Sequence, residues 1–257
     1  MASRRKTLSQ NFLYHPGVLR SIAACAALRP GDLVVEPGAG EGALTRVLAG
    51  RAREVVAHEL DPALAARLPR RVRGLPNVRV VRGDFLRSTP PRLPFVVVGN
   101  IPYARTTDIV RWCLRAPRLR SATLVTQLEY ARRRTGGFGR WPLITVLSWP
   151  EHEWLLGPRI DRAHFTPVPR THSAVLRLVR RPVPLLPPAE LPDYRALVTA
   201  GFTGPGGSVR AALARGRRAR RVSAALEAAG VPREATAGLV TPAQWLALHR
   251  RLAATRP

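Results

Sequence analysis

The sequence predicts an α/β protein with a mostly parallel sheet covered by helices and a small helical domain at its C-terminus. Short apolar runs of strand type alternate with helical patterns up to about residue 180, as in sheets built from strand–helix–strand units. A proline-rich connector follows, and the residues beyond it show only helical patterns. With 257 residues, of which 46% are hydrophobic, the chain can form one large domain and a small appendage.

The first part of the chain contains seven apolar runs that predict strands. They are residues 33–35, 55–58, 78–81, 95–98, 123–126, 144–149 and 174–179. Helical periodicity predicts helices near residues 18–28, 44–48, 62–68 and 108–114. Only a loop separates the last two predicted strands, so we expect an antiparallel pair at one edge of the sheet.

The connector RRPVPLLPPAELP marks the expected domain boundary, with residues 1–180 before it and residues 181–257 after it. Helices are predicted at residues 194–202, 209–214, 223–229 and 242–253. Thr241 precedes Pro242 and is a suitable N-cap for the last helix. An appendage of about 70 residues is small for independent folding, so we expect it to dock on the main domain.

The chain is strongly basic. It has 42 Lys and Arg against 16 Asp and Glu, a formal net charge of +26, and Lys6 is its only lysine. Positive charge spread along a whole chain attracts a polyanion, and arginine both binds phosphate and stacks on bases. No basic amphipathic helix stands beside an apolar anchor, so nucleic acid is favoured over a membrane surface as the partner.

Two arginine clusters are the candidate nucleic-acid-binding residues. One follows the fifth predicted strand, and the other lies in the C-terminal helices. They are Arg132, Arg133 and Arg134, and Arg215, Arg217, Arg218, Arg220 and Arg221. The first cluster is expected at the carboxyl edge of the sheet, where ligands of such sheets bind. The alternative for either cluster is an ordinary solvated face.

The two cysteines, Cys25 and Cys113, stand alone rather than in a paired motif. Neither a metal site nor a disulfide framework is expected from them, and buried reduced thiols suit a cytoplasmic protein. The sequence shows no apolar run of membrane-spanning length and no leader-type segment at its start. We therefore expect a soluble cytoplasmic monomer.

A glycine-rich turn follows the first predicted strand. Gly38, Gly40 and Gly42 form the pattern G-x-G-x-G, which differs from the G-x-G-x-x-G of dinucleotide-binding loops. Glu36 stands before the first glycine, where a carboxylate would repel a pyrophosphate but suit a cation. The sulfonium and α-ammonium of S-adenosyl-L-methionine would fit such a loop, and a tight turn without a ligand is the alternative.

Two carboxylates follow the next two predicted strands. Glu59 comes 21 residues after Gly38, a spacing at which a carboxylate binds ribose hydroxyls. Asp84 follows the third predicted strand, where it can accept a hydrogen bond from the adenine amine of the same cofactor. Either residue alone could be a solvated charge, but both together with the glycine loop favour a nucleoside-containing ligand.

The tetrapeptide Asn100-Ile101-Pro102-Tyr103 follows the fourth predicted strand and has the groups needed to bind an aromatic amine. The Asn100 amide oxygen and the Ile101 carbonyl can each accept one N–H of the amine. Pro102 stiffens the turn, and Tyr103 offers a ring on which a flipped base stacks. These groups predict methylation at N6 of adenine; an ordinary Asn-x-Pro loop is the alternative.

Over roughly residues 8–180 the chain resembles the Erm family of 23S rRNA adenine-N6 methyltransferases. The matching motifs are Ser9-Gln10-Asn11-Phe12, Glu36-Pro37-Gly38-Ala39-Gly40-Glu41-Gly42, His58-Glu59-Leu60-Asp61, Gly83-Asp84-Phe85, Gly99-Asn100-Ile101-Pro102-Tyr103 and Phe165-Thr166-Pro167-Val168-Pro169-Arg170. The resemblance implies a Rossmann-like sheet of the class I S-adenosylmethionine-dependent methyltransferases.

The resemblance also implies roles for individual residues. The residues expected at the cofactor are Asn11 and Leu13 at its methionine end, Gly38 and Gly40 at its backbone, Glu59 at its ribose, Asp84 at its adenine, and Asn100. Asn100, Ile101, Pro102 and Tyr103 would hold the target base, and Phe165 would stack on its other face.

The activity implied is methylation of one adenosine in the peptidyl-transferase region of 23S rRNA, before the ribosome is fully assembled. Family members thereby block macrolides, lincosamides and streptogramin B. Three alternatives remain at this point: a small-subunit rRNA adenine dimethyltransferase, a DNA adenine methyltransferase, and a non-catalytic RNA- or transcription-binding protein on the same fold.

Overall fold

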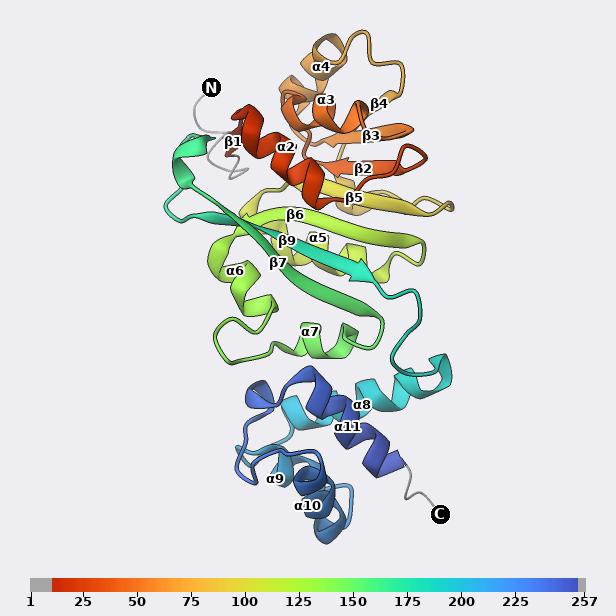
Figure 1. Cartoon of the computed structure of the whole chain (residues 1–257), viewed down its shortest axis with the longest axis vertical. Coiled ribbons are helices and arrows are strands. Elements are labelled where there is room, and N and C mark those ends of the chain that lie inside the picture. The colour runs from red at the N-terminus through yellow and green to blue at the C-terminus, as the bar shows by residue number, and fades with distance from the viewer. Residues whose placement is uncertain (1–10, 254–257) are drawn as a thin grey trace. The chain divides into compact units, whose positions relative to one another are not determined.

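The computed structural model describes residues 11–253, and they form two compact units (Figure 1). The first unit runs to Ala131 and resumes over Leu155–Arg180. The second unit contains Arg132–Trp154 and the chain from Arg181 onward. Among the described residues, no helix combines the length and apolar character needed to cross a membrane.

The first unit is built on a seven-stranded sheet with the strand order β4-β3-β2-β5-β6-β9-β7 (Figure 1). Its strands are β2 (Leu33–Pro37), β3 (Glu54–Glu59), β4 (Val78–Arg82), β5 (Phe95–Asn100), β6 (Leu119–Gln127), β7 (His152–Ile160) and β9 (Ser173–Arg180). The strands from β4 through β6 are parallel, and β9 is antiparallel to β6. The expected mostly parallel sheet is thus confirmed.

Helices cover both faces of this sheet. They are α2 (Pro16–Cys25), α3 (Ala43–Ala49), α4 (Pro62–Arg71) and α5 (Thr106–Arg115). In Figure 1, α2 and α3 lie in front of the sheet and α5 lies behind it. Because the central strands are covered on both sides, they consist of continuous apolar residues: Val34, Val35, Val97 and Val98 are all at most 2% exposed.

The strand order reverses direction between β2 and β5, since the chain builds outward from β2 on one side and from β5 on the other. At such a switch point the loops after the two strands separate and leave a crevice at the carboxyl ends of the strands. The loop after β2 carries Gly38, Gly40 and Gly42, and the loop after β5 carries Ile101 and Pro102. The sheet topology therefore brings the two motifs to one place.

The predicted strand at residues 144–149 was wrong, because this segment forms helix α7 (Leu143–Ser148). An apolar run of six residues with β-branched side chains does not distinguish a strand from a buried helical turn. Pro142 occupies the N-cap position of α7, and Val146 is buried in the core of the second unit. Residues 132–154 accordingly belong to the second unit, whereas the sequence had placed them in the first domain.

The edge strand β7 was not expected from the sequence. It contains Gly157 and Pro158, which suggest a loop. Proline is compatible with an edge strand, where not every backbone N–H is needed in the sheet, and a Cβ added to Gly157 would lie 3.0 Å from the Cβ of Val175 on β9. Close approach of the two strands thus explains the glycine.

The second unit contains short helices around one apolar core. Besides α7 they are α8 (Leu191–Thr203), α9 (Val209–Ala214), α10 (Ala219–Ala228) and α11 (Pro242–Ala253), while α6 (Leu128–Arg134) follows β6. Trp245 and Tyr194 are fully buried in this core, and the Tyr194 hydroxyl donates to the Val146 carbonyl at 2.9 Å. The predicted C-terminal helices are confirmed, including the N-cap: Thr241 Oγ1 accepts from the Gln244 N–H at 3.2 Å.

Several short elements complete the described chain. Strand β1 (Phe12–Leu13) pairs antiparallel with β8 (Phe165–Thr166) and places Leu13 opposite Phe165. The single-turn 3₁₀ helices are η1 (Phe85–Arg87), η2 (Tyr103–Arg105), η3 (Arg162–His164), η4 (Pro188–Glu190) and η5 (Ala237–Leu239). The β1–β8 pairing joins two segments that are far apart in the sequence. No local sequence pattern indicates this pairing.

Candidate active site

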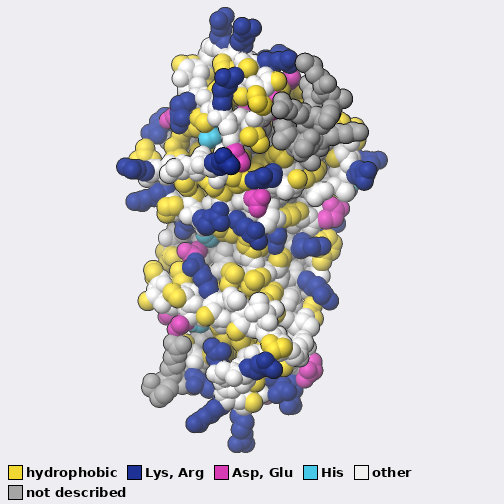
Figure 2. All heavy atoms as spheres, turned by 180° about the vertical axis from the view of Figure 1, so that it is seen from behind, with side chains coloured by type: hydrophobic (Ala, Val, Ile, Leu, Met, Phe, Trp, Pro, Cys, Tyr) yellow, Lys and Arg dark blue, Asp and Glu magenta, His cyan; other side chains and the backbone are white. Residues whose placement is uncertain are grey.

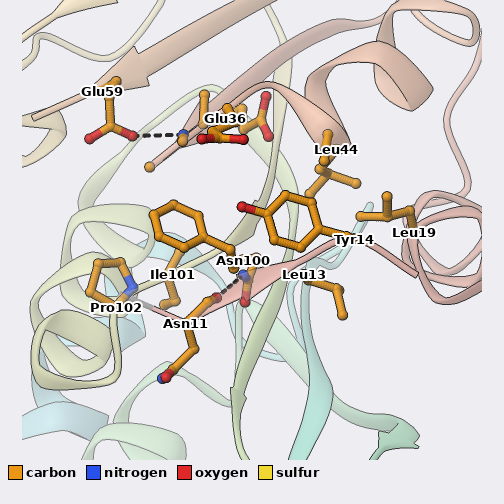
Figure 3. Close-up of a pocket in the computed structure, with 16 residues that line it drawn as sticks. Asn11, Leu13, Tyr14, Leu19, Glu36, Leu44, Glu59, Asn100, Ile101 and Pro102 are labelled. Atoms are coloured by element: carbon orange, nitrogen blue, oxygen red, sulfur yellow. Dashed lines mark hydrogen bonds between the residues drawn. The ribbon is translucent and has the colours of Figure 1, made fainter. Parts of the chain in front are cut away.

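A pocket in the first unit opens at the switch point of the sheet (Figure 3). It is formed by β1, the glycine loop after β2, the first turn of α3 and the ends of β3 and β5. Its lining residues are Asn11, Phe12, Leu13, Tyr14, Leu19, Glu36, Gly38, Ala39, Gly40, Glu41, Ala43, Leu44, Glu59, Asn100, Ile101 and Pro102. Most residues that the sequence assigned to cofactor and amine binding thus surround one pocket.

The glycine loop is held by backbone hydrogen bonds to the neighbouring strand. The N–H groups of Gly38 and Ala39 both donate to the His58 carbonyl at 2.9 Å. Gly38 and Gly40 have φ values of 72° and 59°, in the left-handed region that favours glycine. A Cβ on Gly40 would lie only 3.2 Å from the Phe12 ring, so a side chain there would also displace this wall of the pocket.

Glu59 fixes the same loop from the end of β3. Its Oε2 accepts from the Gly40 N–H at 2.7 Å and its Oε1 from the Asp61 N–H at 2.8 Å (Figure 3). The residue is only 1% exposed, and burial raises the pKa of its carboxyl above the ordinary value. Each carboxylate oxygen retains accepting capacity, so Glu59 can bind ribose hydroxyls while it shapes the loop.

Glu36 is the most strongly perturbed acid of the pocket. It is 1% exposed, and the Thr45 hydroxyl donates to its Oε2 at 2.6 Å. Burial raises the pKa of Glu36 to about 8; the Thr45 hydrogen bond opposes this shift and the charge of Glu59 adds to it. A cation bound in the pocket would favour the ionised form and lower this pKa again.

The lining of the pocket is acidic although the chain as a whole is strongly basic. The described residues lining it include three glutamates, Glu36, Glu41 and Glu59, and neither Arg nor Lys. A site for a phosphate-containing ligand would be expected to use some of the abundant arginines. Carboxylates therefore indicate a cationic ligand, and S-adenosyl-L-methionine, with its sulfonium and ammonium, fits the groups that are present.

A second pocket adjoins the first and shares Gly38, Glu59 and Pro102 with it. Its other lining residues are Pro37, His58, Leu60, Gly83, Asp84, Phe85, Leu86, Arg105 and Ile109. These are mainly apolar side chains with one carboxylate, Asp84, whose Oδ1 accepts from the Leu86 N–H at 2.9 Å. An apolar slot with a carboxylate at its rim suits an adenine ring with its amine.

Asn100, at the end of β5, is hydrogen-bonded to the residue that precedes β1. Its Nδ2 donates to the Asn11 backbone carbonyl at 2.8 Å (Figure 3). This hydrogen bond uses the donor side of the amide and leaves Oδ1 as an acceptor for an incoming amine. Ile101 and Pro102 line the first pocket, while Tyr103 is held from the side by a 2.6 Å hydrogen bond between its hydroxyl and Ser173 Oγ.

Phe165 differs from the expectation that it would present a stacking face to the target base. Its side chain is 1% exposed and packs in the same apolar core as Leu13 and Ile22, and it lines neither pocket. A fully buried ring has no free face, so a base could stack on it only after neighbouring groups had moved. In this structure Phe165 supports β1 through the β1–β8 pairing, and its stacking role stays a prediction.

Sequence reasoning missed the aromatic and aliphatic walls of both pockets. In the first pocket these are Phe12, Tyr14, Leu19 and Leu44, and in the second they are Leu60, Phe85, Leu86 and Ile109. Leu60 directly follows Glu59 in the sequence, and this position beside a site carboxylate was an available signal; in the structure its side chain is 48% exposed. The other side chains reach the pockets from helices and strands whose packing is not evident from local patterns.

The structure divides the candidate RNA-binding arginines into exposed and anchored ones. Arg132 and Arg133 at the end of α6 are exposed, whereas Arg134 is half-buried. In the second cluster Arg215, Arg217, Arg218 and Arg220 are exposed. Arg221 donates from Nη2 to the Leu252 carbonyl at 2.7 Å, so part of its role is to hold α11. Basic side chains are spread over the face shown in Figure 2.

The remaining titratable residues of interest are the two cysteines and His58, which also lines the second pocket. Among the described residues, no group of three or more His, Cys, Asp or Glu is placed to bind a metal. Cys25 and Cys113 are free thiols; Cys113 is buried as expected, whereas Cys25 is only partly buried. His58 is 6% exposed and packs edge-on against Phe85 at 5.6 Å, and burial lowers its pKa.

A doubly wound sheet with an antiparallel β9 and an acidic pocket at its switch point defines a Rossmann-like methyltransferase of class I. A family model for ribosomal RNA adenine dimethylases matches residues 1–254, so the chain belongs to this family and is an enzyme. An rRNA methyltransferase of Streptomyces thermotolerans is 51% identical over 97% of this chain and 83% of its own length.

Two further relatives are informative. The crystal structure of the 23S rRNA methyltransferase ErmE has a TM-score of 0.91 and 50% identity, covering 95% of this chain and all of that one. The mycinamicin-resistance protein MyrB of Micromonospora griseorubida is 36% identical over 98% of this chain and 81% of its own length. The resemblance to the Erm family is thereby confirmed.

Glu59→Ala is expected to weaken binding of S-adenosyl-L-methionine by roughly ten- to a hundredfold. The substitution removes an acceptor for charged-group hydrogen bonds worth about 1.5–3 kcal/mol and frees the Gly40 N–H. Calorimetric titration of the folded variant measures the change. Glu54→Ala, at the other end of β3, is the matched control and should bind normally. Unchanged affinity in the Glu59 variant would remove this residue from the site.

Glu36→Gln is expected to change how stability depends on pH when no cofactor is added. Burial raises the pKa of Glu36 from 4.5 to about 8, so between these values the folded chain holds a proton that the unfolded chain releases. The stabilisation is complete below pH 4.5 and is lost as the pH rises to about 8, at up to about 1.4 kcal/mol per pH unit. Glutamine lacks this dependence.

Urea unfolding at pH 6 and pH 9 provides the measurement. The variant should gain stability relative to the wild-type protein at the higher pH, and saturating S-adenosyl-L-methionine should reduce the gain because the cation favours the carboxylate. Glu41→Gln, which changes a more exposed acid of the same pocket, should show neither effect. Parallel pH dependences in wild type and Glu36→Gln would contradict the assigned pKa.

Proposed function

We propose that this enzyme transfers a methyl group from S-adenosyl-L-methionine to N6 of one adenosine in the peptidyl-transferase region of 23S rRNA. The modification would confer resistance to macrolides, lincosamides and streptogramin B. The main support is the match to ErmE over nearly the whole of both chains. The similarity to a mycinamicin-resistance protein supports the resistance role.

The cofactor residues of the proposal are those around the two pockets. Glu36 and Glu59 provide negative charge to the cationic methionine end and acceptors to the ribose, and Asp84 accepts from the adenine amine. Asn11 and Leu13 line the methionine side, and Gly38 and Gly40 allow close approach of the backbone. When bound, the cofactor supplies an electrophilic methyl group.

The chain's contribution to the reaction is to orient the adenine amine. Its N6 lone pair is delocalised into the ring and is a weak nucleophile. Asn100 Oδ1, oriented by the Asn11 carbonyl, and the Ile101 carbonyl accept the two N–H groups and direct the lone pair toward the methyl. The same acceptors stabilise the positive charge that develops on nitrogen, so the proton can leave to water after transfer.

The proposed substrate is 23S rRNA before its proteins have assembled. A target base must leave its stack to reach Asn100, and an unpaired loop makes this less costly than a paired helix. Protein-free 23S rRNA should therefore be methylated faster than complete large subunits by the same preparation. We place the enzyme in the cytoplasm, where this RNA is made, and propose that it acts as a monomer.

Primer extension on ribosomal RNA from a sensitive bacterium expressing the protein tests the target. We expect one modified adenosine in the peptidyl-transferase loop of the large-subunit RNA and increased macrolide tolerance, with neither in cells expressing Asn100→Ala. Two adjacent modified adenines in small-subunit RNA, without macrolide tolerance, would instead establish the small-subunit dimethyltransferase. Absence of modification in either RNA would favour a DNA substrate or a non-catalytic role.

A further inference from the structure

The loop between α6 and α7 presents an aromatic ring to solvent. It has the sequence Thr-Gly-Gly-Phe-Gly-Arg-Trp over residues 135–141 and belongs to the second unit. Phe138 at its centre is 53% exposed, although the chain has only six phenylalanines and buries others completely. A side chain this exposed contributes little to the core of the unit, so its ring is accessible to a ligand.

Both ends of this loop are anchored, so the exposed ring is not the tip of a loose segment. The N–H groups of Thr135 and Gly137 donate to the Arg132 carbonyl at 3.2 and 2.8 Å. At the other end the Trp141 N–H donates to the Gly238 carbonyl at 2.7 Å. These hydrogen bonds reduce the conformational freedom that would be lost when a ligand binds to the loop.

Packing against Trp141 requires glycine at position 136, near the start of the loop. A Cβ added to Gly136 would lie 2.3 Å from the Trp141 indole, and its φ of 77° is in the left-handed region. The indole in turn packs edge-on against Trp149, with 5.6 Å between ring centroids. The loop therefore rests on a partly buried aromatic pair that packs against the core of the second unit, while Phe138 remains exposed.

The segment that carries Phe138 is basic. Arg132, Arg133 and Arg140 are exposed, and residues 132–141 contain neither Asp nor Glu. An accessible ring among arginines matches single-stranded nucleic acid, whose bases stack on aromatic side chains while its phosphates bind arginine. A paired helix would supply the phosphates but keep its base faces stacked. A purely apolar protein partner would leave the arginines without counter-charges.

We propose that Phe138 stacks on an unpaired base of the RNA substrate while Arg132, Arg133 and Arg140 bind the adjacent phosphates. The inference rests on the proposed function, because it assigns part of the RNA surface of the same enzyme. It also explains how a protein with charge spread over its surface distinguishes an RNA loop from a paired helix. The arginines would bind the phosphates of a loop and of a paired helix alike, whereas Phe138 would add affinity only where a base is unpaired.

The test compares two RNAs of equal length and composition, one a hairpin with an unpaired loop and the other fully paired. Phe138→Ala should weaken binding to the hairpin by about 5- to 150-fold and leave binding to the duplex unchanged, as measured by fluorescence anisotropy. The slope of affinity against salt should not change, since no charge is removed. Phe138→Trp should bind as well as the wild-type protein.

Val183→Ala is the matched control, because it truncates a side chain of the second unit that is 78% exposed and has no part in the loop. It should bind both RNAs normally. A 2-aminopurine placed in turn at each loop position should be quenched at one position by the wild-type protein and not by Phe138→Ala. Equal losses for hairpin and duplex, or no loss in a variant with unchanged melting temperature, would overturn the proposal.

These results are separable from those for the proposed function. If the wild-type protein methylates 23S rRNA and Phe138→Ala does so with unchanged KM, the proposed function stands and the stacking inference fails. If neither protein methylates 23S rRNA but only the wild type quenches the 2-aminopurine, the stacking site stands and the target assignment fails.

Discussion

Asn100→Ala is expected to lower kcat for RNA methylation by about 10²- to 10³-fold while changing cofactor affinity much less. The substitution removes an acceptor that stabilises charge developing on the target amine, and the loss of one such oriented group typically has this magnitude. Single-turnover assays with saturating RNA measure the chemical step, and calorimetry measures cofactor binding. A near-normal rate would show that the tetrapeptide does not hold the target base.

Two further variants define the role of the amide. Asn100→Asp keeps a side chain of the same shape but replaces the donor to the Asn11 carbonyl with a repelling oxygen, so it should also be slow. Asn77→Ala is the control: its Nδ2 donates to the Ala49 and Ala52 carbonyls at 2.8 and 3.0 Å, away from both pockets. It should reduce stability and leave kcat of the folded fraction unchanged.

The double variant Arg132→Glu, Arg133→Glu is expected to show the second large effect, on RNA affinity. Each lost phosphate contact should reduce the slope of log affinity against log salt by about 0.7–0.9, so two contacts would flatten it by about 1.4–1.8. Both side chains are exposed, so their replacement should leave folding intact; Arg134 is half-buried and is therefore left unchanged. Anisotropy titrations at several salt concentrations give the slope.

Arg70→Glu, Arg71→Glu provides a control with the same change in net charge. These two arginines are adjacent and exposed at the end of α4, as the first pair is at the end of α6. The control should reduce RNA affinity only by lowering the overall positive charge of the protein. It should keep most of the slope of log affinity against log salt. If the two double variants have equal slopes, RNA is bound by the distributed charge rather than by this cluster.

Much of the fold was predictable because the central strands are continuous apolar runs. Strands β2 and β5 are buried on both faces, so their patterns do not depend on which neighbour covers them. The secondary-structure predictions were wrong where the same local pattern can form either of two structures, depending on what it packs against. Residues 143–148 form a helix because they pack into the core of the second unit, and β7 forms despite Gly157 and Pro158 because it lies at an edge.

The sequence by itself determined the family, the glycine loop and the strand-end carboxylates, since the chemistry of these groups depends on residue type and on short spacings. Only the tertiary structure decided which groups meet. The Asn100–Asn11 hydrogen bond joins residues 89 positions apart, and Phe165, to which the family resemblance assigned the target base, is buried beside the β1–β8 pairing. Likewise, the raised pKa of Glu36 results from its burial in the folded pocket, which could not be predicted from the residue type.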